Sequence, residues 1–64
     1  MNKHDLIELQ YEITGIIVTL QAQGFQSNNK PFREWCLEHS FRLERINKEI
    51  EQFLIAMGGR HEKA

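Results

Sequence analysis

The chain has 64 residues, one cysteine and a formal net charge of −1. This length allows one domain with a small core that adds little net stability. One cysteine excludes an intramolecular disulfide and is typical of a reducing compartment, so we expect a cytoplasmic protein. The charge balance argues against a nucleic-acid ligand, and the longest apolar run is too short to cross a membrane.

The first predicted element is a helix over residues 3–23. Asn2 can cap its start, Asp5 suits the positive end of the helix dipole, and Met1 can pack on Leu6. Gly24 is predicted to end the helix in the left-handed C′ position. Apolar residues recur at alternating three- and four-residue spacing, which predicts a packing seam of Leu6, Leu9, Ile13, Ile16 and Leu20.

The second predicted element is a helix over residues 31–57, begun by Pro31 and closed by Gly58. Its predicted seam is Phe32, Cys36, His39, Leu43, Ile46, Ile50, Phe53 and Met57. His39 is the strongly polar member, and we expect it to face residues 12–19. Glu12 or Thr19 would accept its proton there.

A short loop between two long helices favours an antiparallel arrangement. The predicted fold is therefore an all-α two-helix hairpin. Residues 1–57 form its single helical-hairpin domain, and residues 58–64 form a flexible C-terminal tail.

Each predicted helix carries a second apolar row about 140° around from its seam. A lone hairpin has one internal face, so these rows would stay exposed, and the longer second helix would extend past the start of the first. A homodimeric four-helix bundle would cover both the second apolar rows and the protruding end of the second helix. The rival is a monomer whose second face binds a different protein. The predicted interface comprises Ile7, Tyr11, Val18, Leu37, Phe41, Phe53, Leu54 and Met57.

Catalytic and metal chemistry find little support in the residue pattern. Cys36 and His39 have ligand-like spacing, but a structural zinc site needs four ligands, and the other histidines belong at the far end of the hairpin. Cys36 also falls on the predicted seam, where thiols are usually inert. We therefore expect no metal, no cofactor and no catalytic residues.

The stretch from Ser40 to Glu44 resembles the Ser-x-x-Leu-Asp signature of the small aspartyl-phosphate phosphatases that regulate sporulation in bacilli. The resemblance covers roughly residues 6–54, and those proteins are helical hairpins too. It implies docking on a response regulator, with Glu44 at the position of the family's functional acid and Ser40 beside it. Glu44 stands where that family has aspartate, and Ile13 replaces its basic residue.

The leading hypothesis is a small non-enzymatic protein–protein interaction module or regulator, of the kind that bacteria and phages encode. It would act as a homodimer that presents a helical face to another protein. One alternative is a phosphatase that acts on the aspartyl phosphate of a receiver domain through Glu44 and Ser40. A second alternative is an RNA-binding helical hairpin, although the basic stripe expected for that function is absent.

Overall fold

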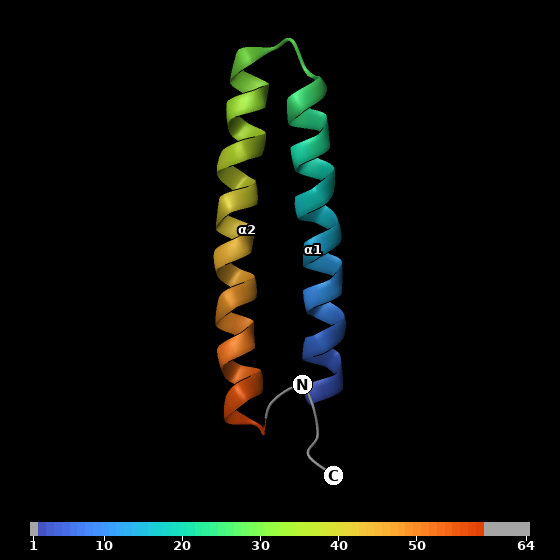
Figure 1. The fold of residues 1–64 in the computed structure, drawn as a ribbon, viewed down its shortest axis with the longest axis vertical. Coiled ribbons are helices and arrows are strands. Elements are labelled where there is room, and N and C mark those ends of the chain that lie inside the picture. Colours follow the sequence, from blue (N-terminus) through green and yellow to red (C-terminus); the bar gives the residue numbers. More distant parts are fainter. Residues whose placement is uncertain (1, 59–64) are drawn as a thin grey trace.

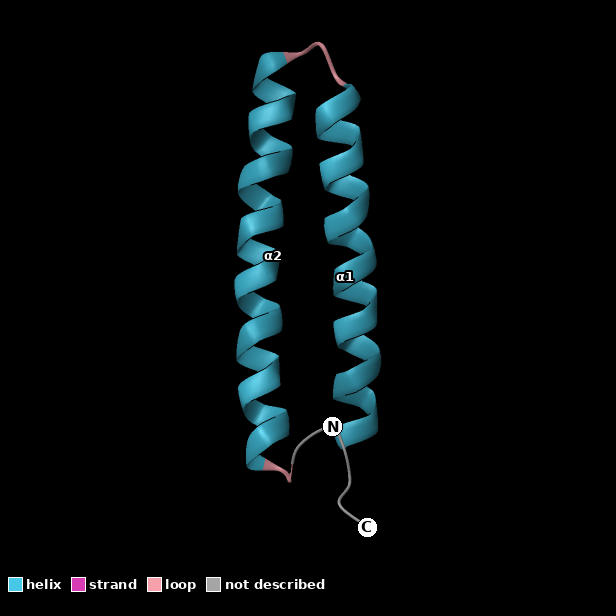
Figure 2. Ribbon diagram, in the orientation of Figure 1, coloured by secondary structure: helices cyan, strands magenta, loops and turns pink. Residues whose placement is uncertain are grey.

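The computed structural model describes residues 2–58 and shows an antiparallel α-hairpin. Helix α1 spans Lys3–Gln26 and helix α2 spans Lys30–Ala56, and the two lie side by side over their whole length (Figure 1). Residues 2–58 contain no β-strand (Figure 2). The predicted all-α hairpin is confirmed, and α1 continues past its predicted end at residue 23.

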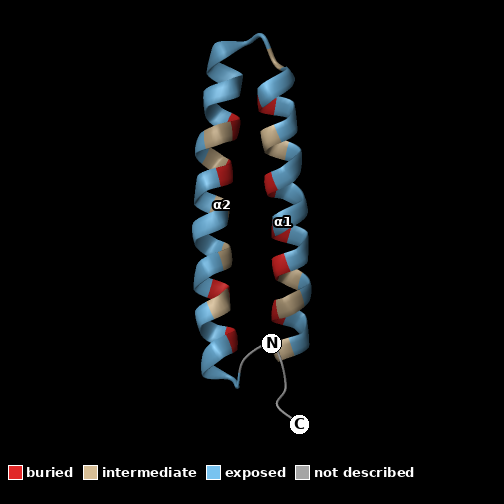
Figure 3. Cartoon of the chain, in the orientation of Figure 1, coloured by how far each residue is buried: buried red, intermediate tan, exposed pale blue. Residues whose placement is uncertain are grey.

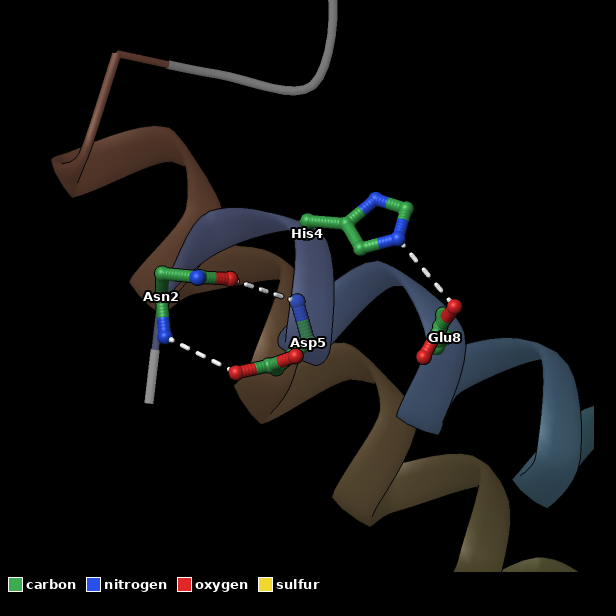
Figure 4. A network of polar contacts seen from close by, with 4 residues as sticks. All are labelled: Asn2, His4, Asp5 and Glu8. Carbon is green, nitrogen blue, oxygen red and sulfur yellow. Dashed lines mark hydrogen bonds and ion pairs between the residues drawn. The ribbon is translucent and has the colours of Figure 1, made fainter.

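α1 begins with the predicted cap. The Asn2 side-chain oxygen accepts a hydrogen bond from the Asp5 backbone N–H at 2.9 Å, and the Asp5 carboxylate accepts one from the Asn2 backbone N–H at 3.4 Å (Figure 4). This capping box satisfies two donors at the helix start. In the same turn His4 Nε2 lies 3.1 Å from a carboxylate oxygen of Glu8. Met1 lies outside the described residues.

α2 is also delimited by local signals. The Asn29 side-chain oxygen accepts a hydrogen bond from the Phe32 backbone N–H at 3.0 Å, and Pro31 occupies the first turn, where a missing N–H is harmless. Gly58 has φ of 109°, and its N–H donates to the Ile55 carbonyl at 3.1 Å. This left-handed glycine ends α2 as predicted. The rest of the predicted tail, residues 59–64, lies outside the described residues.

Gly24 does not end α1, so its predicted C′ role is wrong. It lies inside the helix and is buried against α2. A Cβ placed on Gly24 would lie 3.1 Å from the Cβ of Cys36 and 3.7 Å from the carbonyl oxygen of Arg33. The absence of a side chain lets the two helices approach closely next to the loop.

The core between the helices is small (Figure 3). Leu54 is 0% exposed and packs with residues near the start of α1. The expectation that Leu54 projects beyond the cover of its own chain, as an interface residue, is therefore wrong. Cys36 is buried separately beside the loop. The core cluster consists of Leu6, Ile13, Ile17, Ile50 and Leu54.

Each helix is rotated by about 40° from the orientation predicted by its apolar stripe. Five residues predicted on the seams are exposed instead: Ile16, Phe32, Ile46, Phe53 and Met57. Two polar residues are buried in the seam, Gln10 on α1 and Ser40 on α2. The stripe on each helix is wider than one helix–helix contact, so periodicity alone leaves this rotation open. The residues buried between the helices are Leu6, Gln10, Ile13, Ile17, Gly24, Cys36, Ser40, Ile50 and Leu54.

Candidate protein-interaction site

A layer of polar side chains crosses the hairpin. Gln10 Nε2 donates hydrogen bonds to the Asn47 carbonyl at 3.2 Å and to the Glu51 carboxylate at 3.1 Å. Asn47 Nδ2 donates to Thr14 Oγ1 at 3.1 Å, and that hydroxyl donates to the Gln10 carbonyl at 2.8 Å. This layer was not predicted from the sequence, although the spacing of Leu6, Gln10 and Ile13 is compatible with Gln10 on the seam.

The polar layer fixes how the helices are matched along their length. Thr14 lies beside Asn47, and near the loop Gly24 lies beside Cys36. A buried polar position of this kind can specify helix register at some cost in stability. The cost is visible here, because the side-chain oxygens of Gln10 and Asn47 are buried and accept no hydrogen bond within residues 2–58.

His39 does not fill the role predicted for it. It is half-buried, and its Nδ1 donates to the carbonyl oxygen of Trp35, one turn earlier, at 2.9 Å. Its ring stacks on Trp35 with centroids 4.2 Å apart, and Trp35 stacks in turn on Phe32 at 6.3 Å. The expectation that Glu12 or Thr19 accepts its proton is therefore wrong. His39 belongs to a row of stacked rings along α2.

The hairpin has two opposite flanks. In an antiparallel pair, residues displaced in the same rotational sense from the seam lie on the same flank. The polar contacts agree with this geometry. Thr14 on α1 and Glu51 on α2 are both displaced from the seam in the same rotational sense, and both belong to one hydrogen-bonded layer. Ile46 lies about 80° around α2 in the other sense. The exposed apolar side chains can therefore be sorted by the sense of their displacement from the seam. Phe41 is displaced by about 140° and lies toward the outer side of α2, where it lines one hollow together with Ile46.

We name the two surfaces after their central residues on α2. The Ile46 face has six exposed apolar residues, Ile16, Phe32, Trp35, Ile46, Phe53 and Met57. The Phe41 face has five, Tyr11, Val18, Phe25, Phe41 and Ile55. Both faces draw residues from both helices.

The predicted interface residues are divided between these surfaces. Tyr11, Val18 and Phe41 are exposed on the Phe41 face, where Ile7 and Leu37 are half-buried. Two others from the same prediction, Phe53 and Met57, are exposed on the Ile46 face. The sequence analysis missed Ile16 and Ile46 as surface residues because their spacing fits an internal seam equally well.

The residues of the phosphatase alternative are arranged unfavourably for contact with a phosphoryl group. Ser40 is 0% exposed, and its hydroxyl donates to the Leu37 carbonyl at 2.8 Å. Glu44 is exposed one turn later. A serine buried between two helices cannot reach a substrate without separation of those helices.

Residues 2–58 offer neither a metal-binding cluster nor a membrane-spanning helix. Cys36 is buried as a free thiol, and no group of three histidine, cysteine or acidic side chains is placed to hold a metal ion in this part of the chain. Neither α1 nor α2 contains a stretch apolar enough to span a bilayer.

Comparisons with protein-family models, with curated proteins and with solved structures found no match to this chain. The resemblance to the sporulation phosphatases therefore stays a hypothesis. The functional assignment depends on the two faces and the chemistry of their residues.

Proposed function

We propose that this chain is a non-enzymatic protein–protein interaction module that acts by helix packing. The observation that carries the proposal is the presence of apolar faces on both flanks of one hairpin. Monomeric soluble proteins rarely keep extended apolar strips exposed, and such strips usually mark contact surfaces. A module of this kind would regulate a partner by occupying part of its surface.

The small core supports the same proposal. Five buried apolar residues form the cluster that holds α1 to α2, and two polar residues interrupt it. A chain of this size generally needs reinforcement from an oligomer, a metal or a disulfide. Association with a second helical surface would bury apolar area that the hairpin leaves exposed, and a homodimer is the simplest form of it.

A photo-crosslinking experiment tests whether the Phe41 face binds a different protein. A crosslinking amino acid is placed at Phe41, and in a matched variant at Ala56, which is exposed on α2 outside both faces. We expect a defined adduct with another protein from the Phe41 position, lost when Val18→Asp is added. Equal labelling from both positions would contradict the proposal.

The phosphatase alternative is tested directly on phosphorylated receiver domains. The interaction module should leave the rate of aspartyl-phosphate loss unchanged. A faster loss that Glu44→Gln abolishes would replace the proposed function by the enzymatic one.

A further inference from the structure

The rotation of α2 leaves most of its exposed apolar residues on one flank of the hairpin. A hairpin optimised as a monomer would turn Ile16 and Ile46 inward and Gln10 and Asn47 outward. Helix α2 is instead turned so that most of its exposed apolar residues lie on the Ile46 face, where Ile16 is the exposed apolar neighbour from α1. In a four-helix bundle each helix contacts two neighbours roughly at right angles, so its stripe is centred between them. The apolar stripe of α2 therefore has the orientation expected of a helix in such a bundle.

We propose that the Ile46 face is covered by a second copy of this chain, with α2 packed antiparallel on α2 of that copy around a two-fold axis beside Ile46. This inference deepens the proposed function and rests on it. It commits the Ile46 face to self-association and leaves the Phe41 face free for a different protein.

The α2 sequence is self-complementary about Ile46. On the Ile46 face, Trp35 and Met57 are equidistant from position 46, and so are His39 and Phe53. In an antiparallel two-fold pair, equidistant positions meet. Each end of the contact therefore places an aromatic or imidazole ring against an apolar side chain, with Ile46 meeting its own copy at the centre.

The charges at the rim of this contact are also complementary. Arg42 and Glu49 flank Ile46 on opposite sides at nearly equal distance, so each Arg42 would meet Glu49 of the second copy. Within its own chain Arg42 pairs with Glu38 at 3.2 Å on an exposed surface, and its guanidinium has further donors available. Glu49 has no ion pair or hydrogen bond from its side chain within residues 2–58. The two-fold pair would supply one.

α1 agrees with the same axis. Because Thr14 lies beside Asn47, an axis beside Ile46 passes α1 near position 14, close to the middle of that helix. Asp5 and Gln23 are equidistant from position 14, whereas the equidistant pair Glu12 and Ile16 sets a carboxylate beside an apolar side chain and adds nothing to the contact. This arrangement aligns the full length of both hairpins and gives Asp5 an amide partner.

The available area suits a stable dimer. The helices are about 36 and 40 Å long, and two of them side by side offer a face about 20 Å wide. The covered area is then roughly 750 Å² for each copy, close to the 800 Å² or so per partner of standard specific interfaces.

The first experiment compares Ile46→Asp with Phe41→Asp by sedimentation equilibrium. Both residues are exposed on α2, at 42% and 64%, and lie about 140° apart around the helix, on the two edges of one hollow on its outer side. We expect the wild type and Phe41→Asp to be dimers, and Ile46→Asp to dimerise at least about 100-fold more weakly, because two carboxylates would be desolvated at the axis. The reverse result would move self-association to the Phe41 face and overturn this inference while leaving the interaction module intact. A wild type that stays monomeric at high micromolar concentration would overturn self-association altogether.

A disulfide test covers the case in which Ile46→Asp fails to fold. In a Cys36→Ala background, Ile46→Cys should give a covalent dimer under mild oxidation, and the matched Phe41→Cys should not. In a bundle with α2 packed on α1 of the other copy, the two positions 46 would be diagonal and too far apart for a disulfide. Absence of the Ile46→Cys dimer, or equal crosslinking at Phe41→Cys, would overturn the antiparallel α2 contact.

A charge exchange tests the orientation independently. Arg42→Glu and Glu49→Arg should each weaken dimerisation by about tenfold, since each creates two like-charge contacts. The double variant should recover most of the loss. Failure of the double variant to recover would count against the Arg42–Glu49 pairing between copies.

Discussion

Gly24 and Cys36 lie opposite each other where α1 and α2 approach the loop. A Cβ on Gly24 would sit 3.1 Å from the Cβ of Cys36, which is closer than side chains normally pack. The space is limited by the helices themselves rather than by a movable side-chain end. This contact sets how closely the two helices can approach.

Gly24→Ala should therefore lower the free energy of unfolding by about 1 kcal/mol, because overpacking outweighs the better helix propensity of alanine. Gly15→Ala is the matched control, since a Cβ at Gly15 meets nothing within 4 Å and its φ is not positive. That variant should raise the free energy of unfolding by about 0.5–1 kcal/mol. Urea denaturation at one fixed protein concentration measures both. Equal stabilisation by the two changes would show that the helices separate easily at Gly24.

The polar layer should be replaceable by apolar residues with a gain in stability. Gln10→Leu combined with Asn47→Leu removes two buried oxygens that accept no hydrogen bond in residues 2–58 and adds apolar area. We expect the free energy of unfolding to rise by about 1–2 kcal/mol, and the helices to lose specificity of register. Denaturation and size-exclusion chromatography check the two effects. A loss of stability would show that the layer is net stabilising.

Removing the side chain that caps α2 should lower the free energy of unfolding more than removing the side chain of the preceding residue. Asn29→Ala removes the acceptor for the Phe32 backbone N–H and should lower the free energy of unfolding by about 1 kcal/mol. Asn28→Ala changes the same residue type one position earlier, where no side-chain hydrogen bond is made within the described residues. Thermal unfolding of the two variants should differ accordingly. An equal loss in both would indicate that the loop, rather than the cap, is being disturbed.

Removal of metal ions by a chelator should leave the thermal stability of the protein unchanged. Cys36 is buried, and His39 donates from Nδ1 to the Trp35 carbonyl, so the pair cannot complete a tetrahedral site. We expect the same melting temperature with and without EDTA in circular dichroism. A large decrease with EDTA would reveal a metal site formed with residues outside 2–58.

The sequence by itself determined the helices and their ends. The three- and four-residue spacing of apolar residues is a local property of each segment, and caps act over three or four residues. Asn2 with Asp5, Pro31 and Gly58 could therefore be interpreted without knowledge of the partner helix. The antiparallel hairpin followed, because a short loop leaves two long helices few other arrangements.

Only the tertiary structure decided which part of each apolar stripe faces inward. Ile16 and Ile46 fit an internal seam as well as Ile17 and Ile50 do, because a stripe broad enough for two neighbours is compatible with several rotations of the helix. The choice depends on contacts between residues far apart in the chain, such as Asn47 with Thr14 and Cys36 with Gly24. These contacts exist only after the helices have packed, so local spacing could not reveal them.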